Sequence, residues 1–597
     1  MTVNALSLVV SILFVGCLSS FADASRNVLL QARSVWHVDD DGKVDQGWQA
    51  PDFDHSAWPT KTAPIGYGKD GWLSDRSLTA KNSHTVVYFR KVFTVDDPAK
   101  YPHAHLTANY DDGIIAYLNG EEIGRSSSMT GRKANPNSHE GGRYETIAKI
   151  QSAKLRKGKN VLAIELHNRN MGSSDMGLDA SIVVAPTAQA SQKTSQPGAS
   201  QHNKIITRIT PLKGSTPAQW RLSWKEDPAH KATLSWSTAK PDGEHLIYFD
   251  TVSHKGRLDA YANRLVCQLS GRYRLSDNEL KAAADRRPPE AYYHHARMTE
   301  LRPNTTYYVV MVSNAVASRE FHFKTAPIED VAMSFIHGGD SRSGITARTL
   351  VNDMISQHVS KFPEIIAFIH GGDYIGSGRS WGQWRMWLSQ NELITTPEGR
   401  LVPIVPAKGN HDGGILIAQV FDFDQQKQRY YYDVSFGPQF ALVTLDTNIA
   451  GTGAQESYLK EALPRLRPDH RWLITQYHRP LWPAVKGVPS HKRVFVPVFE
   501  RHNVDMALES DGHCMKRTVR IRNDKADPTG IVYLGEGGLG VGQRQADTSR
   551  WYLKADAGAM VGSAHHIVRL DLSESKLRSR FIQLDGSIAD DYSQSPR

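Results

Sequence analysis

Five short motifs in the second half of the chain carry side chains that could bind metal ions. They are IHGGD ending at Asp340, IHGGD ending at Asp373, GNHD over 409–412, QYHRP around His478, and ESDGH over 509–513. Divalent cations take carboxylate, amide and imidazole ligands, and glycines beside the aspartates let the backbone turn closely. One such fragment is weak evidence, because a Gly-Asp pair is usually a turn and a lone histidine is usually packed. Five in order, each after an apolar run, indicate a metal site.

The elements that must position these motifs are predicted strands. Apolar runs of strand length occupy 333–337, 365–370, 401–406, 440–445 and 472–477, and a helical pattern occupies 347–358. Strands that alternate with helices predict an α/β domain. Ligands of such sheets bind beyond the carboxyl ends of the strands. We therefore expect the motifs to converge at strand ends within a domain over 328–590.

From about 332 to 584 the sequence resembles the calcineurin-like metallophosphoesterase superfamily, and GNHD is its most specific motif. The layout from Lys204 onward resembles purple acid phosphatases. The resemblance implies a four-layer α/β (αββα) domain and a secreted hydrolase of phosphate esters, with monoesters favoured over diesters. It also implies two divalent metal ions (Mn, Zn or Fe) and attack on phosphorus by metal-activated water.

The resemblance also assigns the metal ligands. The last motif of the family is Gly-His-x-His, and matching it to Gly512-His513 would leave Met515 at a ligand position. The flanking residues favour another register, in which Asp511 takes the place of the first histidine and His513 that of the second. One metal then has Asp340, Asp373 and His513, and the other has Asp373, Asn410, His478 and Asp511.

Three further residues receive catalytic roles from the resemblance. His411 would stabilise the transition state or protonate the leaving oxygen, and Asp412 would orient it. Arg342 stands where the first family motif has a histidine or glycine, and it would hold a phosphate oxygen instead. Gly376 stands where purple acid phosphatases carry the tyrosine that ligates iron(III), which argues against a purple colour.

Two β-rich modules precede this domain. Residues 25–184, with YFRKVF, DDGIIAYLNG and GKNVLAIELHN, resemble the galactose-binding-like jelly rolls of secreted hydrolases. That resemblance implies a carbohydrate ligand, for which Trp58, Tyr67 and Trp72 are candidates, although core packing is the favoured interpretation. Residues 204–327, with HHARMTELRPNTTYYV, resemble the fibronectin-like β-sandwich that precedes the catalytic domain of purple acid phosphatases. Residues 185–203 are rich in Ala, Ser, Gln and Thr and predict a flexible linker.

The N-terminus predicts export. An apolar run over 6–15 precedes Ala22-Asp23-Ala24, so residues 1–24 read as a signal peptide of a secreted or periplasmic protein. An imperfect lipobox at Cys17 leaves a lipid anchor as the alternative. The formal net charge of +9 is spread along the chain, and we find neither a nucleic-acid-specific motif nor a later transmembrane segment.

Two local patterns and one rival function complete the predictions. The glycine-rich segment 535–542 reads equally as a wall of the site or as a plain turn, and the tryptophans at 381, 384 and 387 predict a packed helix face. The rival function is a carbohydrate-binding or surface protein whose phosphoesterase domain is degenerate.

Overall fold

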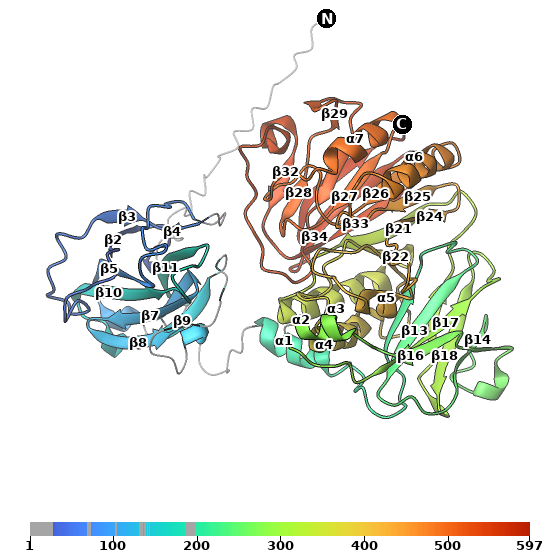
Figure 1. Cartoon of the computed structure of the whole chain (residues 1–597), viewed down its shortest axis with the longest axis horizontal. Coiled ribbons are helices and arrows are strands. Elements are labelled where there is room, and N and C mark those ends of the chain that lie inside the picture. Colours follow the sequence, from blue (N-terminus) through green and yellow to red (C-terminus); the bar gives the residue numbers. More distant parts are fainter. Residues whose placement is uncertain are drawn as a thin grey trace, which may run out of the picture. The chain divides into compact units, whose positions relative to one another are not determined.

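The computed structural model describes residues 28–68, 73–101, 104–129, 135–136, 139, 141, 144–184, 197–283 and 285–597. The chain forms two compact units, 1–191 and 192–597, drawn from blue to red along the sequence in Figure 1. The predicted signal peptide, Cys17, Trp72 and residues 185–196 lie outside the described residues. Within the described part of the chain, no helix has the length and apolar character needed to cross a membrane.

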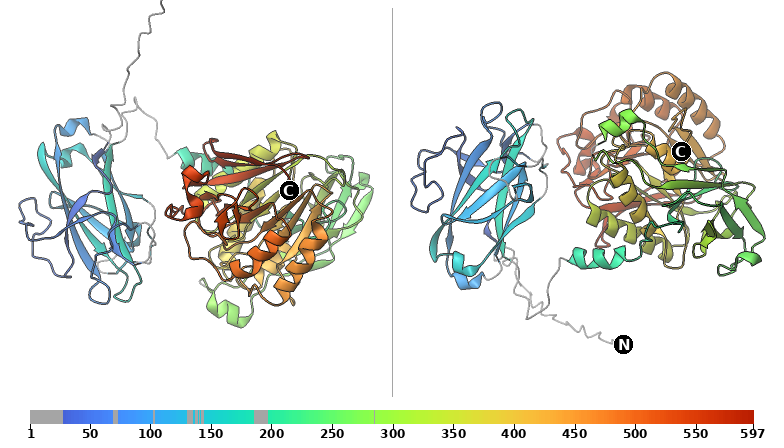
Figure 2. Two further views of the ribbon diagram at one scale, coloured as in Figure 1. Left: turned by 90° about the horizontal axis from the view of Figure 1, so that it is seen from above. Right: turned by 60° about the horizontal axis from the view of Figure 1, so that its bottom comes forward.

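The first unit consists of two antiparallel sheets, seen from two further sides in Figure 2. Side chains from both sheets, including Leu106, Ile182 and Phe89, form one buried core. The segments YFRKVF, GIIAYL and GKNVLAIELH of the quoted motifs all lie in strands of these sheets. One sheet has the order β1 (Val28–Leu30), β11 (Met176–Val184), β6 (Ala104–Asp111), β9 (Glu145–Ile150), with β4 (Ile65–Tyr67) also on β11. The other has the order β3 (Thr60–Thr62), β2 (Val35–Asp39), β5 (Val86–Val95), β10 (Gly158–His167), β7 (Gly113–Leu118), β8 (Glu121–Arg125).

Two of the aromatic residues that could have stacked on a sugar are packed in this unit. Tyr67 is buried, and its hydroxyl accepts a hydrogen bond of 2.7 Å from the side-chain amide of Asn168. Trp58 stacks on the buried Trp48, with ring centroids 6.2 Å apart. The packing interpretation therefore holds for Tyr67, whereas Trp58 is only partly buried.

The end of the predicted flexible linker is helical, which corrects the prediction for residues 197–203. Helix α1 (Pro197–Ile206) packs against α3 (Ile345–Lys361), with Ile205 buried. A proline at the first helical position fits the helix start, since it lacks the N–H that would be unpaired there. Composition alone did not reveal that Ile205 would be buried.

The second unit contains two large sheets that pack face to face. The ten-stranded sheet has the order β16 (Leu269–Arg272), β17 (Tyr292–Met298), β13 (Ala232–Thr238), β12 (Ala218–Ser223), β23 (Ile404–Pro406), β22 (Ile365–His370), β21 (Met333–Gly338), β33 (His566–Leu572), β34 (Leu577–Gln583), β35 (Ile588–Gln594). The seven-stranded sheet has the order β24 (Tyr432–Phe436), β25 (Phe440–Thr444), β26 (Trp472–Gln476), β27 (Met506–Glu509), β31 (Val532–Gly535), β28 (Met515–Arg517), β32 (Met560–Gly562). Phe335 and Ile369 of the first sheet share a core with Leu442 and Ile474 of the second.

Helices cover the outer faces of both sheets, as Figure 1 shows. Successive residues of a strand face opposite sides, so Ile336 turns away from the shared core and packs against the helices instead. The helices α3, α4 (Trp381–Asn391) and α5 (Leu416–Phe421) lie on the first sheet, and α6 (Ala454–Leu466) and α7 (Lys492–Arg501) lie on the second. The predicted helix at 347–358 lies within α3. The three tryptophans of α4 are buried, which confirms the packed helix face.

The predicted module over 204–327 shares its sheet and its core with the α/β part. Ser223 of β12 pairs with Ile404 of β23, and the Trp224 N–H donates to the Ile404 carbonyl at 2.9 Å. Trp236 lies in the same hydrophobic cluster as Phe335. The remaining strands of this region form a smaller sheet of β15 (Asn263–Val266), β14 (His245–Asp250), β18 (Thr306–Ser313), β19 (Val316–Ala317) and β20 (Phe321–Lys324), and β29 (Ile521–Arg522) pairs with β30 (Lys525–Ala526). A short helix, α2 (Asp277–Ala282), also lies in this region.

Candidate metal centre

The predicted ligands follow the carboxyl ends of strands in both large sheets. Asp340, Asp373 and Asn410 come two to four residues after β21, β22 and β23, which are neighbouring parallel strands. His478 and Asp511 each come two residues after β26 and β27, which are also parallel neighbours. Because parallel strands end at the same edge of their sheet, five ligands from distant parts of the chain meet there.

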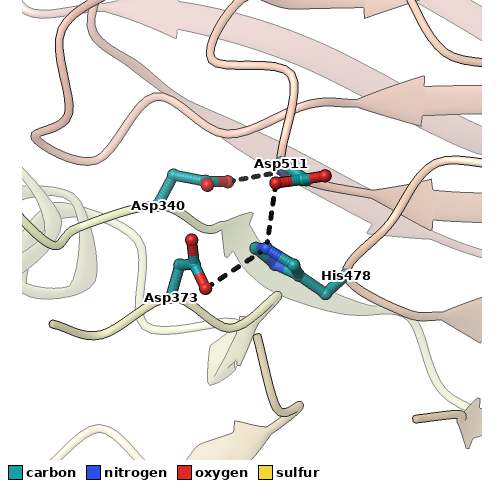
Figure 3. Close-up of side chains that lie close together, drawn as sticks. All are labelled: Asp340, Asp373, His478 and Asp511. Carbon is teal, nitrogen blue, oxygen red and sulfur yellow. Dashed lines mark hydrogen bonds and ion pairs between the residues drawn. The ribbon is translucent and has the colours of Figure 1, made fainter. Parts of the chain in front are cut away.

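Four of these side chains form a tight buried cluster, drawn in Figure 3. Asp340, Asp373, His478 and Asp511 each offer one ligand atom, and these atoms lie within 4.8 Å of one another. His478 Nε2 lies 3.3 Å from Asp373 Oδ1 and 3.5 Å from Asp511 Oδ1. The Asp511 backbone N–H donates to Asp340 Oδ2 at 2.9 Å.

The other two predicted ligands adjoin this cluster. Asn410 Oδ1 lies 3.1 Å from His478 Nε2, and His513 Nε2 lies 3.3 Å from Asp340 Oδ1. The Gly371 carbonyl accepts a hydrogen bond from His478 Nδ1 at 2.9 Å, which turns Nε2 toward the oxygens. The structure therefore brings all six predicted metal ligands together.

The cluster is negatively charged, and its carboxylates favour binding of positive charge. Burial disfavours protonation of His478, but the charge of Asp373 and hydrogen bonds to Asp373 and Asp511 outweigh it and raise the His478 pKa well above its ordinary value. Asp340 Oδ1 and Asp373 Oδ2 are buried without a hydrogen-bond partner among the described residues. Leaving buried carboxylate oxygens unpaired is costly, and divalent cations prefer oxygen and imidazole donors of this kind. The donor set thus fits metal ions.

Four ligand residues hold an unusual backbone conformation. The φ angles of Asp340, Asp373, Asp511 and His513 are +60°, +56°, +69° and +62°. Non-glycine residues in this left-handed region cost free energy and cluster at functional sites. Strain at four ligand positions in one cluster supports a functional centre.

Glycines let the backbone approach the carboxylates. A Cβ on Gly409 would lie 2.1 Å from Asp373 Oδ1, and one on Gly537 would lie 2.0 Å from Asp340 Oδ2. The Val541 N–H also donates to the Asp340 carbonyl at 3.0 Å. The glycine-rich segment 535–542 is therefore a wall of the site rather than a plain turn.

The imidazole of His411 faces the cluster from its edge. His411 Nδ1 lies 2.7 Å from the Gly376 carbonyl, which accepts its hydrogen bond, and Nε2 lies 4.0 Å from Asp373 Oδ2. The His411 side chain is 33% exposed, so it is open to a ligand from solvent. The residue at the position of the family tyrosine thus orients this imidazole through its backbone.

The predicted role of Asp412 needs correction. Its carboxylate accepts hydrogen bonds from the backbone N–H groups of Gly409 at 2.8 Å, Asp373 at 2.8 Å and Tyr374 at 3.0 Å. Burial and the nearby charge of Asp373 raise the Asp412 pKa. Asp412 therefore ties the GNHD loop to the second motif and does not orient the His411 ring. The motif alone could not reveal this, since the backbone direction decides where so short a side chain points.

Arg342 lies within the cluster. Its Nε is 3.4 Å from Asp373 Oδ2, and its Nη2 is 3.4 Å from His513 Nε2. A second cation, Lys486, places Nζ 2.5 Å from Asp511 Oδ1. No sequence pattern indicated Lys486, which lies outside the five motifs, whereas the place of Arg342 two residues after Asp340 made it a candidate.

A buried ion cluster behind the last motif also escaped the sequence. Lys516 contacts Glu509 and Glu536, and all three side chains are fully buried. The Glu536 carbonyl accepts the His513 N–H at 2.6 Å. Glu509 is the last residue of β27 and Glu536 comes directly after β31, and these positions at strand ends were the available signal.

Comparison with known proteins agrees with this geometry. Residues 217–325 match the family described as Purple acid Phosphatase, N-terminal domain, and residues 336–515 match Calcineurin-like phosphoesterase. The second compact unit therefore resembles the purple acid phosphatase and calcineurin-like phosphoesterase family over these two segments. This is a family of hydrolases, and both matched segments lie in the second compact unit.

Relatives of this family are distant in sequence. Purple acid phosphatase 15 of Arabidopsis thaliana is 25% identical over 293 residues, which cover 41% of this chain and 53% of the relative. Purple acid phosphatase 18 of the same plant is 24% identical over 304 residues, which cover 46% and 66%. The chain thus spans about half to two thirds of the length of these relatives. The structure of purple acid phosphatase PPD1 from yellow lupin (Lupinus luteus) seeds has a TM-score of 0.54 at 16% identity, covers 86% of this chain and 94% of its own, and shares the fold.

Proposed function

We propose that this purple acid phosphatase-like protein hydrolyses phosphate monoesters with a pair of divalent metal ions. The buried cluster of Asp340, Asp373, His478 and Asp511 carries the proposal, because it gathers three carboxylates and an imidazole, and two of its carboxylate oxygens accept no hydrogen bond from the described residues. Asp340, Asp373 and His513 would hold the first ion, and Asp373, Asn410, His478 and Asp511 the second. Two such ions would supply Lewis acidity toward the phosphate and lower the pKa of a bound water.

The chain supplies two groups for the ester itself. His411 Nε2 is aimed at the cluster while Nδ1 is held by the Gly376 carbonyl, so Nε2 can donate a proton to the leaving oxygen. Arg342 carries a guanidinium that can donate two hydrogen bonds to phosphate oxygens.

Monoesters are favoured by charge. A phosphate monoester carries one more negative charge than a diester near neutral pH. Arg342 and Lys486 add positive charge beside the ligands, which suits the more highly charged ester. With Gly376 in place of a tyrosine, no phenolate is available there for iron(III), so we propose Mn, Zn or ferrous iron.

Export, lipid anchoring and carbohydrate binding also belong to this proposal. The apolar run over 6–15 supports secretion or a periplasmic place, and sequencing the N-terminus of the protein recovered outside the cell would test it. We further assign the first unit, which has its own core, to one β-sandwich module, and the second unit to a second β-sandwich module and a four-layer αββα domain that share a core. A carbohydrate-binding protein with a degenerate phosphoesterase domain is not favoured, because all six ligand positions converge.

Activity of the purified protein on aryl phosphate mono- and diesters, with Mn²⁺, Zn²⁺ or Fe²⁺ supplied separately, tests the function. Asn410→Ala and Asp373→Ala each remove a proposed ligand, and we expect turnover to fall at least about 100-fold. Asn263→Ala is the matched control, since its exposed side chain bonds the Phe249 carbonyl on β14, outside the cluster. Activity that persists in both ligand variants at the level of the control would refute the metal-dependent mechanism.

A further inference from the structure

Arg342 lies among the atoms that would bind the first metal ion. Its Nε and Nη2 are each 3.4 Å from a ligand atom of that ion, Asp373 Oδ2 and His513 Nε2 respectively. The arginine side chain is only 17% exposed. Its Nε is buried and has no hydrogen-bond partner among the described residues. The guanidinium is therefore held against the cluster rather than extended into solvent.

The two proposed ion sites differ in the ligands that the chain supplies. The first has three, Asp340, Asp373 and His513, and Arg342 faces two of them. The second has four ligands, Asp373, Asn410, His478 and Asp511. One oxygen each of Asp373, Asn410 and Asp511 lies within 3.5 Å of His478 Nε2. The second site is richer in ligands, whereas the first is closely opposed by a cation.

We propose that Arg342 makes the centre asymmetric, so that the second site holds one divalent ion tightly and the first site binds its ion weakly. This inference rests on the proposed function, because it concerns the same pair of ions. Arginine stays protonated at all relevant pH values, so its charge cannot be removed to admit the ion. A divalent cation bound by Asp373 Oδ2 and His513 Nε2 would be repelled by the guanidinium that lies 3.4 Å from each of these atoms. The guanidinium and the cation would also compete for these two ligand atoms.

Lys486 does not have the same effect at the second site. It contacts one ligand residue, Asp511, and its side chain is 36% exposed. A lysine has a flexible four-carbon stem and a strongly hydrated ammonium group, so it can turn into water when an ion binds. The second site also keeps Asn410 and His478, which no cation opposes among the described contacts.

The asymmetry has a consequence for substrate binding. Binding of the first ion requires Arg342 to leave its ligands, and a phosphate oxygen offers the displaced guanidinium a new partner. Phosphate and the first ion should therefore bind cooperatively, each increasing the affinity of the other by the same factor.

Metal content of the intact protein tests the inference without measuring turnover. The protein is stripped with a chelator, loaded with Mn²⁺ and desalted, and retained Mn is measured by elemental analysis and by electron paramagnetic resonance. We expect one retained Mn²⁺ in the natural protein, with the uncoupled spectrum of a single ion. Arg342→Gln removes the charge and should retain two coupled ions. Lys486→Gln removes a cation from the other site and should still retain one.

A chelator competition titration of the natural protein gives a second readout that needs no variant. We expect two Mn²⁺ dissociation constants at least about 100-fold apart, and inorganic phosphate should bring them closer. Two equally tight ions in the natural protein, or one retained ion in Arg342→Gln, would overturn the asymmetry while leaving the proposed metal centre intact. So would two ions in Lys486→Gln. No retained Mn²⁺ in any variant would overturn the inference and the proposed function together.

Discussion

Replacing Lys516 by methionine tests whether the last metal motif depends on a buried charge cluster. Lys516 lies on β28 and contacts Glu509 and, at 2.7 Å, Glu536. Methionine keeps a similar length but leaves two buried carboxylates without their cation. Removing one partner of a buried ion pair costs about 3–5 kcal/mol. We therefore expect Lys516→Met to lower the free energy of opening of the seven-stranded sheet by about 4 kcal/mol at pH 7.5.

The loss should depend on pH through Glu536. Burial raises the pKa of Glu536 to about 7, although the charge of Lys516 opposes the rise. Without the lysine this folded-state pKa rises further, while in the unfolded chain it is about 4.3. The folded variant then holds a proton that the unfolded chain has released, so its stability falls as pH rises through that window. The slope reaches about 1.4 kcal/mol per pH unit, which makes the loss greater at pH 8 than at pH 6.

Native-state hydrogen exchange of the β27, β28 and β31 amides measures this opening without requiring the two units to unfold together. Lys460→Met is the matched control. Lys460 pairs with Glu456 at 2.7 Å on the surface of α6, where its side chain is 54% exposed, and such pairs contribute about 0.5 kcal/mol or less. A loss in Lys516→Met no larger than the loss in the control, or one that is independent of pH, would refute the reasoning.

Two further predictions concern backbone contact and acid stability. Gly537→Ala should lower retained Mn²⁺ and turnover by at least about tenfold, because the new Cβ would meet Asp340 Oδ2. Gly586 has a similar positive φ of +84°, but a Cβ there would meet no atom within 4 Å, so Gly586→Ala should leave the metal content unchanged. Equal effects of the two substitutions would contradict this reasoning. Burial, with the charges of neighbouring histidines, lowers the pKa of His294 to about 2. As pH falls below about 6.5, the pKa of a histidine in the unfolded chain, the unfolded chain takes up a proton that the folded protein does not. The free energy of unfolding therefore falls by about 1.4 kcal/mol per pH unit. Urea unfolding at pH 5, 6 and 7 gives the free energy of unfolding at each pH. This free energy should change less with pH in His294→Gln than in the natural protein, and an unchanged pH dependence would count against a neutral buried imidazole.

The sequence predicted the parts of the site that strand ends determine. An apolar run followed by a polar motif indicates both a buried strand and the edge where its next side chains emerge. That reasoning, together with the family resemblance, named six residues that the structure brings together, including Asp511, which a match of Gly512-His513 to the family motif would have missed. The tryptophan spacing of α4 was also readable, because a helix face repeats every three to four residues.

Properties that depend on loop direction or on distant chain segments could not be predicted. Asp412 follows His411 in sequence, yet its carboxylate turns to the backbone of the second motif. Lys486 reaches Asp511 from the loop between β26 and α7, at a position outside the QYHRP motif at the start of that loop. The pairing of Ser223 with Ile404 joins segments far apart in the chain, and hydrophobic periodicity does not specify the partner of a strand edge.

The predicted ligand residues with positive φ depend on hydrogen bonds that the sequence did not predict. Each of the four ligand residues with positive φ has its backbone N–H tied to another part of the chain. Asp340 donates to the Gly372 carbonyl at 3.0 Å, and Asp373 donates to the Asp412 carboxylate at 2.8 Å. Asp511 donates to Asp340, and His513 donates to the Glu536 carbonyl. A left-handed residue costs about 1–3 kcal/mol. A hydrogen bond to a carboxylate, as made by Asp373 and Asp511, returns about 1.5–3 kcal/mol, and one to a backbone carbonyl, as made by Asp340 and His513, returns about 0.5–1.5 kcal/mol. Asp412 and the Lys516 cluster thus stabilise a backbone that side-chain packing alone would not hold, and the ligand geometry depends on residues that touch neither metal nor substrate.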